Sequence, residues 1–312
     1  MRIAVPDLIS PSYFPAIAAV DLGLARDEGL EVELDLLYPV TEAAEALRAG
    51  KIDFLAGAAH APMHAFPGWR GVRLAAALSQ RTYWFLVMRA DLGIARGDLG
   101  ALGRVRIGAA PGPDLGLHRL LAAAGIDTAR HGIEVGPVPA TEGTGTSFGL
   151  AAARALGDGL IDGFWANGMG AELAVREGTG AIVLDARRGD GPAGADAYTF
   201  PALAVTEETI EHRPDDVAAM VRAIVRAQDV LRADPGRATE VGERLFPPRE
   251  ASLITELVRR DAPFYDARID EPTVGALLDF GRDCGILNDP VTYDAVVATR
   301  FADLWNQAEG GT

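Results

Sequence analysis

The sequence is poor in the side chains that many cofactor-linked and metal-dependent enzymes use. It has a single cysteine, Cys284, among 312 residues, so neither an intrachain disulfide nor a cysteine-rich metal cluster can form. It also has a single lysine, Lys51, which removes most candidates for a Schiff base or a cofactor-linked amine. We therefore expect no cofactor and no metal.

Positive charge is scarce as well. The chain has 29 Lys and Arg residues against 44 Asp and Glu, for a formal net charge of -15 and a sequence pI of about 4.8. Nucleic acids and anionic membranes both bind basic surfaces, so the composition argues against either as a partner. No apolar run reaches the roughly 18 residues of a membrane-spanning helix. The length favours two domains over a single core.

The N-terminus resembles a strand and not a secretion signal. Met1–Arg2 leads directly into Ile3–Ala4–Val5, without the apolar segment and small-residue cleavage site of a signal peptide. The sequence as written is therefore expected in the cytoplasm. If a leader was removed, the expected place is the periplasm or the membrane surface.

One phrase occurs twice, at Ala46–Leu55 and at Ala155–Phe164. Each copy contains Ala-Leu, then a glycine, then Ile-Asp and an apolar run. This pattern is typical of an α-helix, a glycine at its C-terminus and a buried strand. Two copies predict two similar α/β lobes, with the working site in a cleft between them.

Short apolar runs alternate with helical stretches as far as about residue 185, which predicts βαβ units and mainly parallel sheets. The predicted strands are residues 2–5, 31–36, 53–56, 72–78, 84–89, 105–109, 134–138, 161–165 and 181–184, with a last strand at 200–205. Helices are predicted to begin near residues 13, 41, 59, 114, 147 and 170, and to cover 214–231, 235–245, 249–260, 271–284 and 291–306.

A late strand followed only by helices favours a chain that completes a second lobe and then returns to the first. We place lobe 1 at residues 1–87 and 200–312, and lobe 2 at 88–199. Two crossovers, Phe85–Arg89 and Thr199–Ala204, would form the hinge. The predicted fold class is α/β, with a mainly parallel sheet flanked by helices in each lobe.

Several phrases stand in the order found in a known family. They are Ala19–Glu33, Gly50–Asp53, Leu99–Ala109, Leu121–Ile126, Gly159–Gly163, and Pro214–Val217 with Val221–Ala223. In these phrases the chain resembles the type 2 periplasmic solute-binding proteins, in the branch of nitrate-, sulfonate- and taurine-binding proteins and thiamine-pyrimidine synthases. The resemblance implies two lobes that close on a small organic solute of the sulfonate, carboxylate, pyrimidine or aromatic class. It also implies the substrate-binding component of an ABC-type importer, with a permease as its partner. We expect a monomer.

In such folds, ligands meet the loops at the carboxyl ends of the strands. The candidate contacts in lobe 1 are Ser10, Tyr13, Thr41, His60 and Arg81. Arg81 could hold a carboxylate or sulfonate with its guanidinium fork. The alternatives are that Ser10 and Thr41 only cap helices, that His60 is a surface histidine and that Arg81 is solvated.

The candidates in lobe 2 are Asp114, Trp165, Asn167 and Tyr198. Asp114 stands in a turn where the family often has serine or threonine. A carboxylate at a helix start satisfies the positive end of the helix dipole. It therefore counts against a simple anion such as nitrate and favours an uncharged or amine-bearing ligand. Alternatively, Asp114 only caps the helix.

The same scaffold also hosts enzymes. The family's pyrimidine synthases need a lysine for pyridoxal phosphate and a cysteine-rich motif, and this chain has neither at the matching places. Aryl-sulfinate desulfinases use a cysteine nucleophile in the first loop, where this chain has Ser10. With His60 as its base, Ser10 could act as a nucleophile, although no acid is placed to orient that histidine. A binding protein is favoured. A cytoplasmic desulfinase-, decarboxylase- or lyase-like enzyme, or a ligand sensor, is the alternative.

Overall fold

A computed structural model describes residues 1–139 and 147–306. The chain forms two compact units, one of Met1–Arg81 with Thr199–Thr312 and one of Thr82–Tyr198. We refer to them as unit 1 and unit 2. The first crossing between units lies at Arg81–Thr82 and not after residue 87 as predicted, because the strand at Phe85–Arg89 pairs within the sheet of unit 2.

The sheet of unit 1 has five strands in the order β2-β1-β3-β10-β4. Strand β1 pairs in parallel with β2 and β3, and β10 runs antiparallel between β3 and β4. The first residues of β10 therefore lie at the same edge as the last residues of β1, β3 and β4. The strands are β1 (Arg2–Val5), β2 (Glu33–Leu36), β3 (Phe54–Ala58), β4 (Val72–Ala77) and β10 (Pro201–Thr206).

The sheet of unit 2 repeats this arrangement in the order β7-β6-β8-β5-β9. Here β6 pairs in parallel with β7 and β8, and β5 runs antiparallel between β8 and β9. The strands are β5 (Phe85–Arg89), β6 (Val105–Ala109), β7 (Ile133–Gly136), β8 (Gly163–Ala166) and β9 (Gly180–Asp185). The predicted α/β class is confirmed. Each sheet is mixed because one strand, β10 in unit 1 and β5 in unit 2, is antiparallel to its neighbours. These are the first strands after the two crossings between units.

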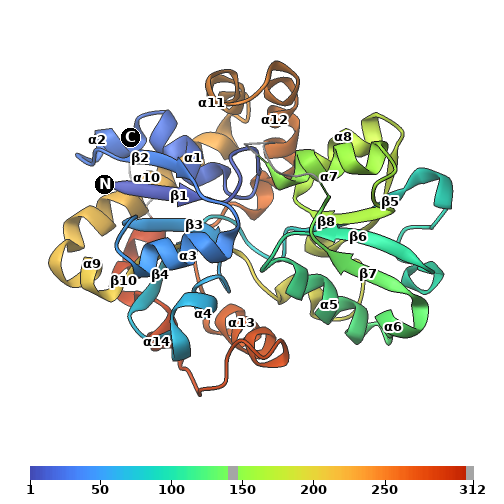
Figure 1. Ribbon diagram of the computed structural model, residues 1–312. Coiled ribbons are helices and arrows are strands. Elements are labelled where there is room, and N and C mark those ends of the chain that lie inside the picture. Colours follow the sequence, from blue (N-terminus) through green and yellow to red (C-terminus); the bar gives the residue numbers. More distant parts are fainter. Residues whose placement is uncertain (140–146, 307–312) are drawn as a thin grey trace. The chain divides into compact units, whose positions relative to one another are not determined.

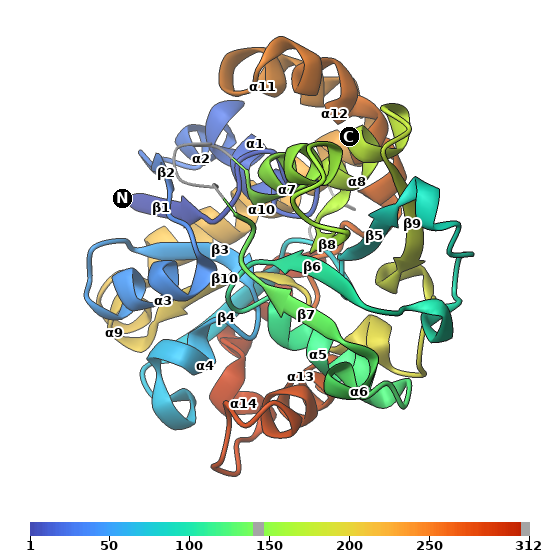
Figure 2. The same ribbon diagram turned by 45° about the vertical axis from the view of Figure 1, so that its right-hand side comes forward.

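Helices flank both sheets. In unit 1, α10 packs against α1 and α2, and α3 packs against α4 and β3 (Figure 1). In unit 2, α7 packs against α8 (Figure 2). The helices of unit 1 are α1 (Phe14–Asp21), α2 (Leu24–Asp27), α3 (Val40–Arg48), α4 (Pro62–Ala65), α9 (Glu207–His212), α10 (Pro214–Ala233), α11 (Arg237–Leu245), α12 (Pro248–Asp261), α13 (Glu271–Asp283) and α14 (Tyr293–Val296). Those of unit 2 are α5 (Asp114–Ala123), α6 (Thr128–His131), α7 (Phe148–Gly157) and α8 (Gly168–Arg176).

Short 3-10 helices complete the structure. They are η1 (Pro67–Trp69), η2 (Ala90–Leu92), η3 (Leu99–Ala101), η4 (Ala186–Arg188), η5 (Ala195–Ala197), η6 (Ala262–Phe264) and η7 (Thr299–Asn306). The helix predicted over residues 291–306 is wrong, because Val297 is extended and forms a bridge to Leu74 of β4. None of the helices within residues 1–139 and 147–306 combines the length and hydrophobicity needed to cross a bilayer.

Both copies of the repeated phrase form the predicted helix, glycine turn and strand. Gly50 ends α3 with φ 66° and Gly159 follows α7 with φ 71°, a left-handed conformation that favours glycine. The backbone N–H of Lys51 donates to the carbonyl of Ala46 at 2.9 Å, and that of Leu160 donates to Ala155 at 2.9 Å. The chain then turns directly into β3 or β8.

The aspartate of each copy joins two neighbouring strands. The Oδ2 atom of Asp53 accepts the backbone N–H of Arg2 at 2.7 Å, and Oδ2 of Asp162 accepts that of Arg106 at 2.8 Å. Each aspartate also donates its own backbone N–H to the carbonyl of the same arginine. These paired bonds set the register at the amino ends of β1 and β3 and of β6 and β8. The repeated Ile-Asp therefore has a structural role, and it lies at the opposite edge of each sheet from the carboxyl ends of the parallel strands.

Candidate functional site

The loops that could bind a ligand in unit 1 follow β1, β3 and β4. They lie at one edge of the sheet because these strands are mutually parallel, and the residue before β10 lies there too. The predicted Ser10 and Tyr13 come from the loop after β1, His60 from the turn after β3 and Arg81 from the segment after β4. Their role in ligand binding stays a prediction.

Ser10 is fully buried, with 0% of its surface exposed. Its Oγ atom has no hydrogen-bond partner among the described residues. A buried hydroxyl without a partner costs about 1–3 kcal/mol. The idea that Ser10 caps the following helix is wrong, since α1 begins at Phe14 and has no side-chain cap. Such a hydroxyl is the kind of group that a bound solute would satisfy.

The loop that carries Ser10 is held from two sides. The Tyr265 hydroxyl, from the segment between α12 and α13, donates to the carbonyl of Pro11 at 2.7 Å. Within the loop, the carboxylate of Asp7 accepts the backbone N–H of Ile9 at 2.9 Å. Tyr13 is buried, and its carbonyl accepts the backbone N–H of Ala16 at 3.0 Å, in the first turn of α1. The loop is therefore preorganised by contacts with distant parts of unit 1.

His60 is also fully buried, at 0% exposed, which makes the surface-histidine alternative wrong. Its Nδ1 atom lies 3.1 Å from the Oγ1 atom of Thr199, two residues before β10. The Phe280 ring of α13 packs edge-on against the imidazole, with 5.5 Å between ring centroids. The backbone N–H of Ala59 donates to the carbonyl of Phe200 at 2.8 Å. His60 is thus fixed to the segment by which the chain returns to unit 1.

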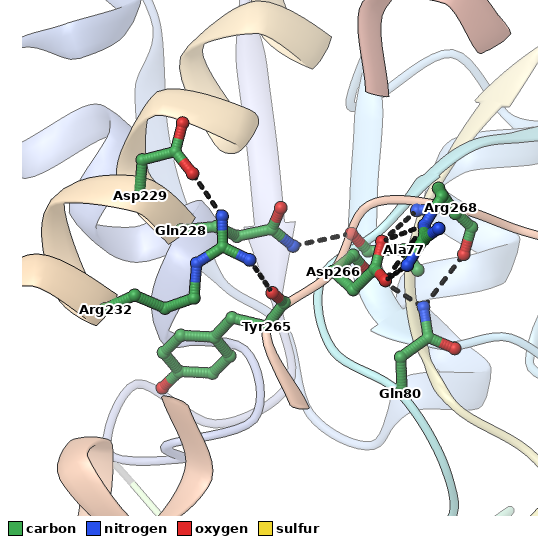
Figure 3. A network of polar contacts seen from close by, with 8 residues as sticks. All are labelled: Ala77, Gln80, Gln228, Asp229, Arg232, Tyr265, Asp266 and Arg268. Carbon is green, nitrogen blue, oxygen red and sulfur yellow. Dashed lines mark hydrogen bonds and ion pairs between the residues drawn. The ribbon is translucent and has the colours of Figure 1, made fainter. Parts of the chain in front are cut away.

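The segment after β4 is held by a polar network (Figure 3). Nε2 of Gln80 donates to the carbonyls of Asp266 and Arg268 at 2.9 and 2.8 Å. From α10, Nε2 of Gln228 donates to the carbonyl of Ala77 at 3.0 Å, and Nη1 of Arg232 donates to the carbonyl of Tyr265 at 2.8 Å. Two chain segments, 77–80 and 265–268, are therefore tied together beside the end of β4.

Near the end of β4, Asp266 is unusual in its pKa and Arg81 is unusual in its backbone conformation. Burial by itself would raise the pKa of Asp266, but hydrogen bonds from the Arg268 side chain and backbone hold it below its ordinary value. The next candidate along the chain, Arg81, is exposed and has φ 68°. A non-glycine residue in this region is uncommon, and such strain is often found at functional sites.

Thr41 does not have the predicted capping position. Helix α3 begins at Val40 and its N-cap is Pro39, which forms no side-chain cap. Thr41 therefore lies inside the first helical turn, half-buried. The prediction that Thr41 is the N-cap is wrong, because the helix begins earlier than the position of the threonine implied.

Among the described residues, three helices begin at the corresponding edge of unit 2, and at each start a side chain accepts a backbone N–H group. The Oδ1 atom of Asp114 accepts the backbone N–H groups of Gly112 and Leu115 at 2.9 and 3.0 Å at the start of α5. Ser147 caps α7, and Oδ1 of Asn167 caps α8. The carboxylate of Asp114 occupies the positive end of α5, which leaves that helix poorly suited to bind an anion.

Trp165 supports the Asp114 turn. It is fully buried, and its Nε1 donates to the carbonyl of Pro113 at 3.1 Å. Its ring packs against Trp84, with 5.7 Å between centroids. Helix α5 can pass these rings because residue 116 is glycine: a Cβ atom at Gly116 would lie 2.7 Å from Trp84. Trp165 therefore has a clear structural role.

Tyr198, the last residue of unit 2, is buried under an arginine. The Cζ atom of Arg119 lies 5.8 Å above its ring centroid. A second arginine, Arg187, stands in the same relation to Tyr83, with Cζ 5.9 Å from the ring centroid. The sequence prediction did not include Arg187, because its burial depends on contacts with residues distant in the sequence. The available signal was an arginine three residues after the predicted strand at residues 181–184.

The nucleophile that a Ser10–His60 pair would form is not assembled. The Ser10 Oγ atom has no hydrogen-bond partner in the described part of the chain, so the imidazole of His60 does not hydrogen-bond to it. A serine needs such a base within hydrogen-bond reach. Within residues 1–139 and 147–306, no group of three or more His, Cys, Asp or Glu side chains could hold a metal ion.

A family model described as NMT1/THI5 like matches residues 10–238. The chain belongs to the NMT1/THI5-like family. Its membership confirms the resemblance inferred from the sequence phrases. No curated protein sequence matches the chain.

Solved structures of similar fold include binding proteins and an enzyme. The alkanesulfonate-binding protein SsuA from Xanthomonas axonopodis pv. citri, bound to MOPS, has 15% sequence identity and a TM-score of 0.72 over 95% of this chain and 97% of that chain. The periplasmic nitrate-binding protein NrtA from Synechocystis PCC 6803 has 14% identity and a TM-score of 0.68, covering 97% and 86%. A mutant of DszB in complex with biphenyl-2-sulfinic acid has 18% identity and a TM-score of 0.65, covering 97% of each chain. At such identities the likeness shows the fold.

Proposed function

We propose that this member of the NMT1/THI5-like family is a solute-binding protein that holds one small organic molecule. The observation that carries the proposal is the buried Ser10 hydroxyl, which lacks a partner among the described residues, at the strand edge that also bears His60. The preorganised loop around Ser10 supports it, because a fixed loop binds without paying much ordering entropy. The solute-binding relatives SsuA and NrtA support it at the level of the fold.

The finer part of the proposal concerns partners and place. We propose that the protein delivers its solute to the permease of an ABC-type importer, and that it acts as a monomer in the periplasm or at the membrane surface. Light scattering of the purified protein tests the monomer. Fractionation of cells that express the natural gene tests the location. Recovery of the protein only in the cytoplasmic fraction would contradict the importer role.

A thermal-shift screen tests the binding function. The probes are sulfonates, carboxylates, pyrimidines and small aromatic molecules, each at several concentrations. A true ligand at about 100 times its Kd stabilises the native state by about 2.7 kcal/mol, which raises Tm by several degrees in a chain of this size.

The same samples distinguish a binding protein from an enzyme. After incubation, chromatography should recover each stabilising solute unchanged. Catalytic consumption of a solute, abolished in Ser10→Ala, would favour the desulfinase-like alternative. The absence of any stabilising solute in all four classes would contradict the proposal.

A further inference from the structure

A cavity with a volume of about 520 Å³ lies in unit 1 beside helix α3. We call it the α3 groove, and the lining residues that concern us are Arg2, Leu37, Glu42, Ala46, Lys51 and Ile52. Neither Ser10 nor His60 lines it. Its volume is within the range of pockets that bind small molecules. The α3 groove is therefore a second place in unit 1, separate from the candidate site, where a ligand could bind.

Both arginines that line the α3 groove are already paired with carboxylates. Nε of Arg2 lies 2.8 Å from Oδ2 of Asp35 in the neighbouring strand. Nη2 of Arg48 lies 2.7 Å from Oε2 of Glu45, one turn earlier in α3. A charge that has an opposite charge beside it attracts a third charge less strongly. These two pairs therefore contribute little net charge toward a ligand.

The other two charged residues of the groove, Glu42 and Lys51, have opposite signs and stand near opposite ends of α3. Glu42 lies in the first turn of the helix, and Lys51 comes three residues after its last residue, Arg48. Neither side chain forms a hydrogen bond or ion pair with a described residue, and both are exposed. An α-helix rises about 1.5 Å per residue, so the two positions are roughly 9 Å apart along its axis.

The glycine turn after α3 does not itself require a lysine at position 51. In the second copy of the repeated phrase the equivalent residue is Leu160, and the backbone N–H of each donates to an alanine carbonyl at 2.9 Å. An arginine also donates to each turn, Arg2 to the carbonyl of Lys51 at 3.4 Å and Arg106 to that of Gly159 at 3.2 Å. The only lysine of the chain therefore lines a cavity from a position where the same turn accepts a leucine.

A ligand complementary to the α3 groove has a cation near Glu42, an anion near Lys51 and an apolar middle that covers Leu37, Ala46 and Ile52. An extended peptide spans at most about 3.6 Å per residue, so the terminal charges of a tripeptide are roughly 10 Å apart. We propose that the α3 groove binds a short zwitterionic peptide of about three residues with an apolar middle residue. Its amino terminus pairs with Glu42 and its carboxylate with Lys51. This binding is independent of the solute site proposed above.

Because the chain has one lysine, the site can be observed directly by nuclear magnetic resonance. Reductive methylation with isotope-labelled formaldehyde labels Lys51 and the amino group of Met1, and methylation keeps the charge of a lysine. Met1 does not line the groove, so its resonance is the internal control. On titration with the peptide Ala-Leu-Ala, we expect the Lys51 resonance to shift in a saturable way and the Met1 resonance to shift much less.

Calorimetry on the unmodified protein tests the two charge contacts. N-acetyl-Ala-Leu-Ala lacks the cation of the peptide, and Ala-Leu-Ala amide lacks its anion. Glu42→Gln and Lys51→Gln remove the protein's charges, with Glu211→Gln and Arg70→Gln as matched controls at exposed positions of unit 1 outside the groove. Each blocked peptide, and each of E42Q and K51Q, should lower the affinity about fivefold, the upper size for an exposed ion pair. Acetylation should have no further effect in E42Q, nor amidation in K51Q, and both control variants should stay within about twofold of the wild type.

Three outcomes would overturn the inference: no binding of Ala-Leu-Ala, binding that leaves the Lys51 resonance unmoved, or equal affinity for the free, acetylated and amidated peptides. Circular dichroism checks the folding of each variant. The blocked peptides test the same charges on unaltered protein, so they decide the question even where a variant does not fold. None of these outcomes concerns the solute site, which the thermal-shift screen tests.

Discussion

At the scale of single residues, the candidate site of unit 1 contains a buried hydroxyl that lowers the stability of the folded protein and that a bound solute could satisfy. Ser10 and His60 are both fully buried polar residues, but they differ in their surroundings. His60 has the Thr199 hydroxyl at 3.1 Å, and the Ser10 hydroxyl has no partner among the described residues. Proteins commonly give up some stability at sites that bind or react.

Ser10→Ala should therefore stabilise the ligand-free protein and weaken binding. Removing an unsatisfied buried hydroxyl should raise the free energy of unfolding by about 1 kcal/mol, measured by urea titration. The affinity for a solute found in the screen should fall several-fold, measured by calorimetry.

Thr206→Ala is the control for this variant. Thr206 caps α9 through the backbone N–H of Thr209 at 3.1 Å, so its loss should cost about 1 kcal/mol and leave affinity unchanged. A destabilised S10A protein with unaltered affinity would show that Ser10 only fills the core.

At the scale of elements, the repeated Ile-Asp explains how each unit begins its sheet. Asp53 and Asp162 each accept the backbone N–H of an arginine in the neighbouring strand and also contact a second arginine, Arg213 at 3.2 Å or Arg89 at 3.4 Å. Burial by itself would raise the pKa of Asp162, but the backbone and side chain of Arg106 and the charge of Arg89 hold it below its ordinary value.

This lowered pKa predicts a contribution to stability that acid removes. The unfolded chain binds the proton first, near the ordinary aspartate pKa of about 3.9, so the contribution is present above that pH. It is lost as the pH falls through the lower pKa of the folded state. Asp162→Asn should lower the free energy of unfolding at pH 7 by about 1–2 kcal/mol, and its stability should fall less between pH 5 and pH 2 than that of the wild type.

The matched control is Glu45→Gln, which removes an exposed carboxylate paired with Arg48. Exposed pairs contribute little, so the pH profile of this variant should follow the wild type. Parallel profiles for D162N and the wild type would contradict the role given to Asp162.

At the scale of the whole molecule, the two units differ in how the chain builds them. Unit 2 is the continuous segment Thr82–Tyr198 and contains all five strands of its sheet. Unit 1 needs β10, which returns after unit 2 to pair with both β3 and β4. Without β10, β4 would have no neighbouring strand among the described residues.

Fragments of the chain should show this difference. A protein of residues 82–198 should fold, with cooperative urea unfolding and dispersed amide resonances. A protein of residues 1–81 should not fold. It lacks β10, so β3 and β4 would lose the strand that lies between them and pairs with both. Cooperative unfolding of the 1–81 fragment, or its absence in the 82–198 fragment, would contradict this account.

Much of the fold could be predicted because its signals are local. The glycine turns at Gly50 and Gly159 and the apolar strands that follow depend on residues close in sequence. The positions of Ser10, His60 and Asp114 after strand ends followed from the same reasoning. Boundaries were less certain: α3 begins at Val40, before the threonine expected to cap it.

Two α/β units, their repeated turns and the loops that follow the strands could be predicted from the amino-acid sequence, because helix and strand periodicity, glycine turns and charge are local properties. The folded chain was needed to show that β5 and β10 are antiparallel to their neighbours, that His60 contacts Thr199, 139 residues away, and that Arg187 is buried against Tyr83. Strand pairing and side-chain burial depend on which segments, far apart in the sequence, pack together. Local sequence patterns do not specify those segments.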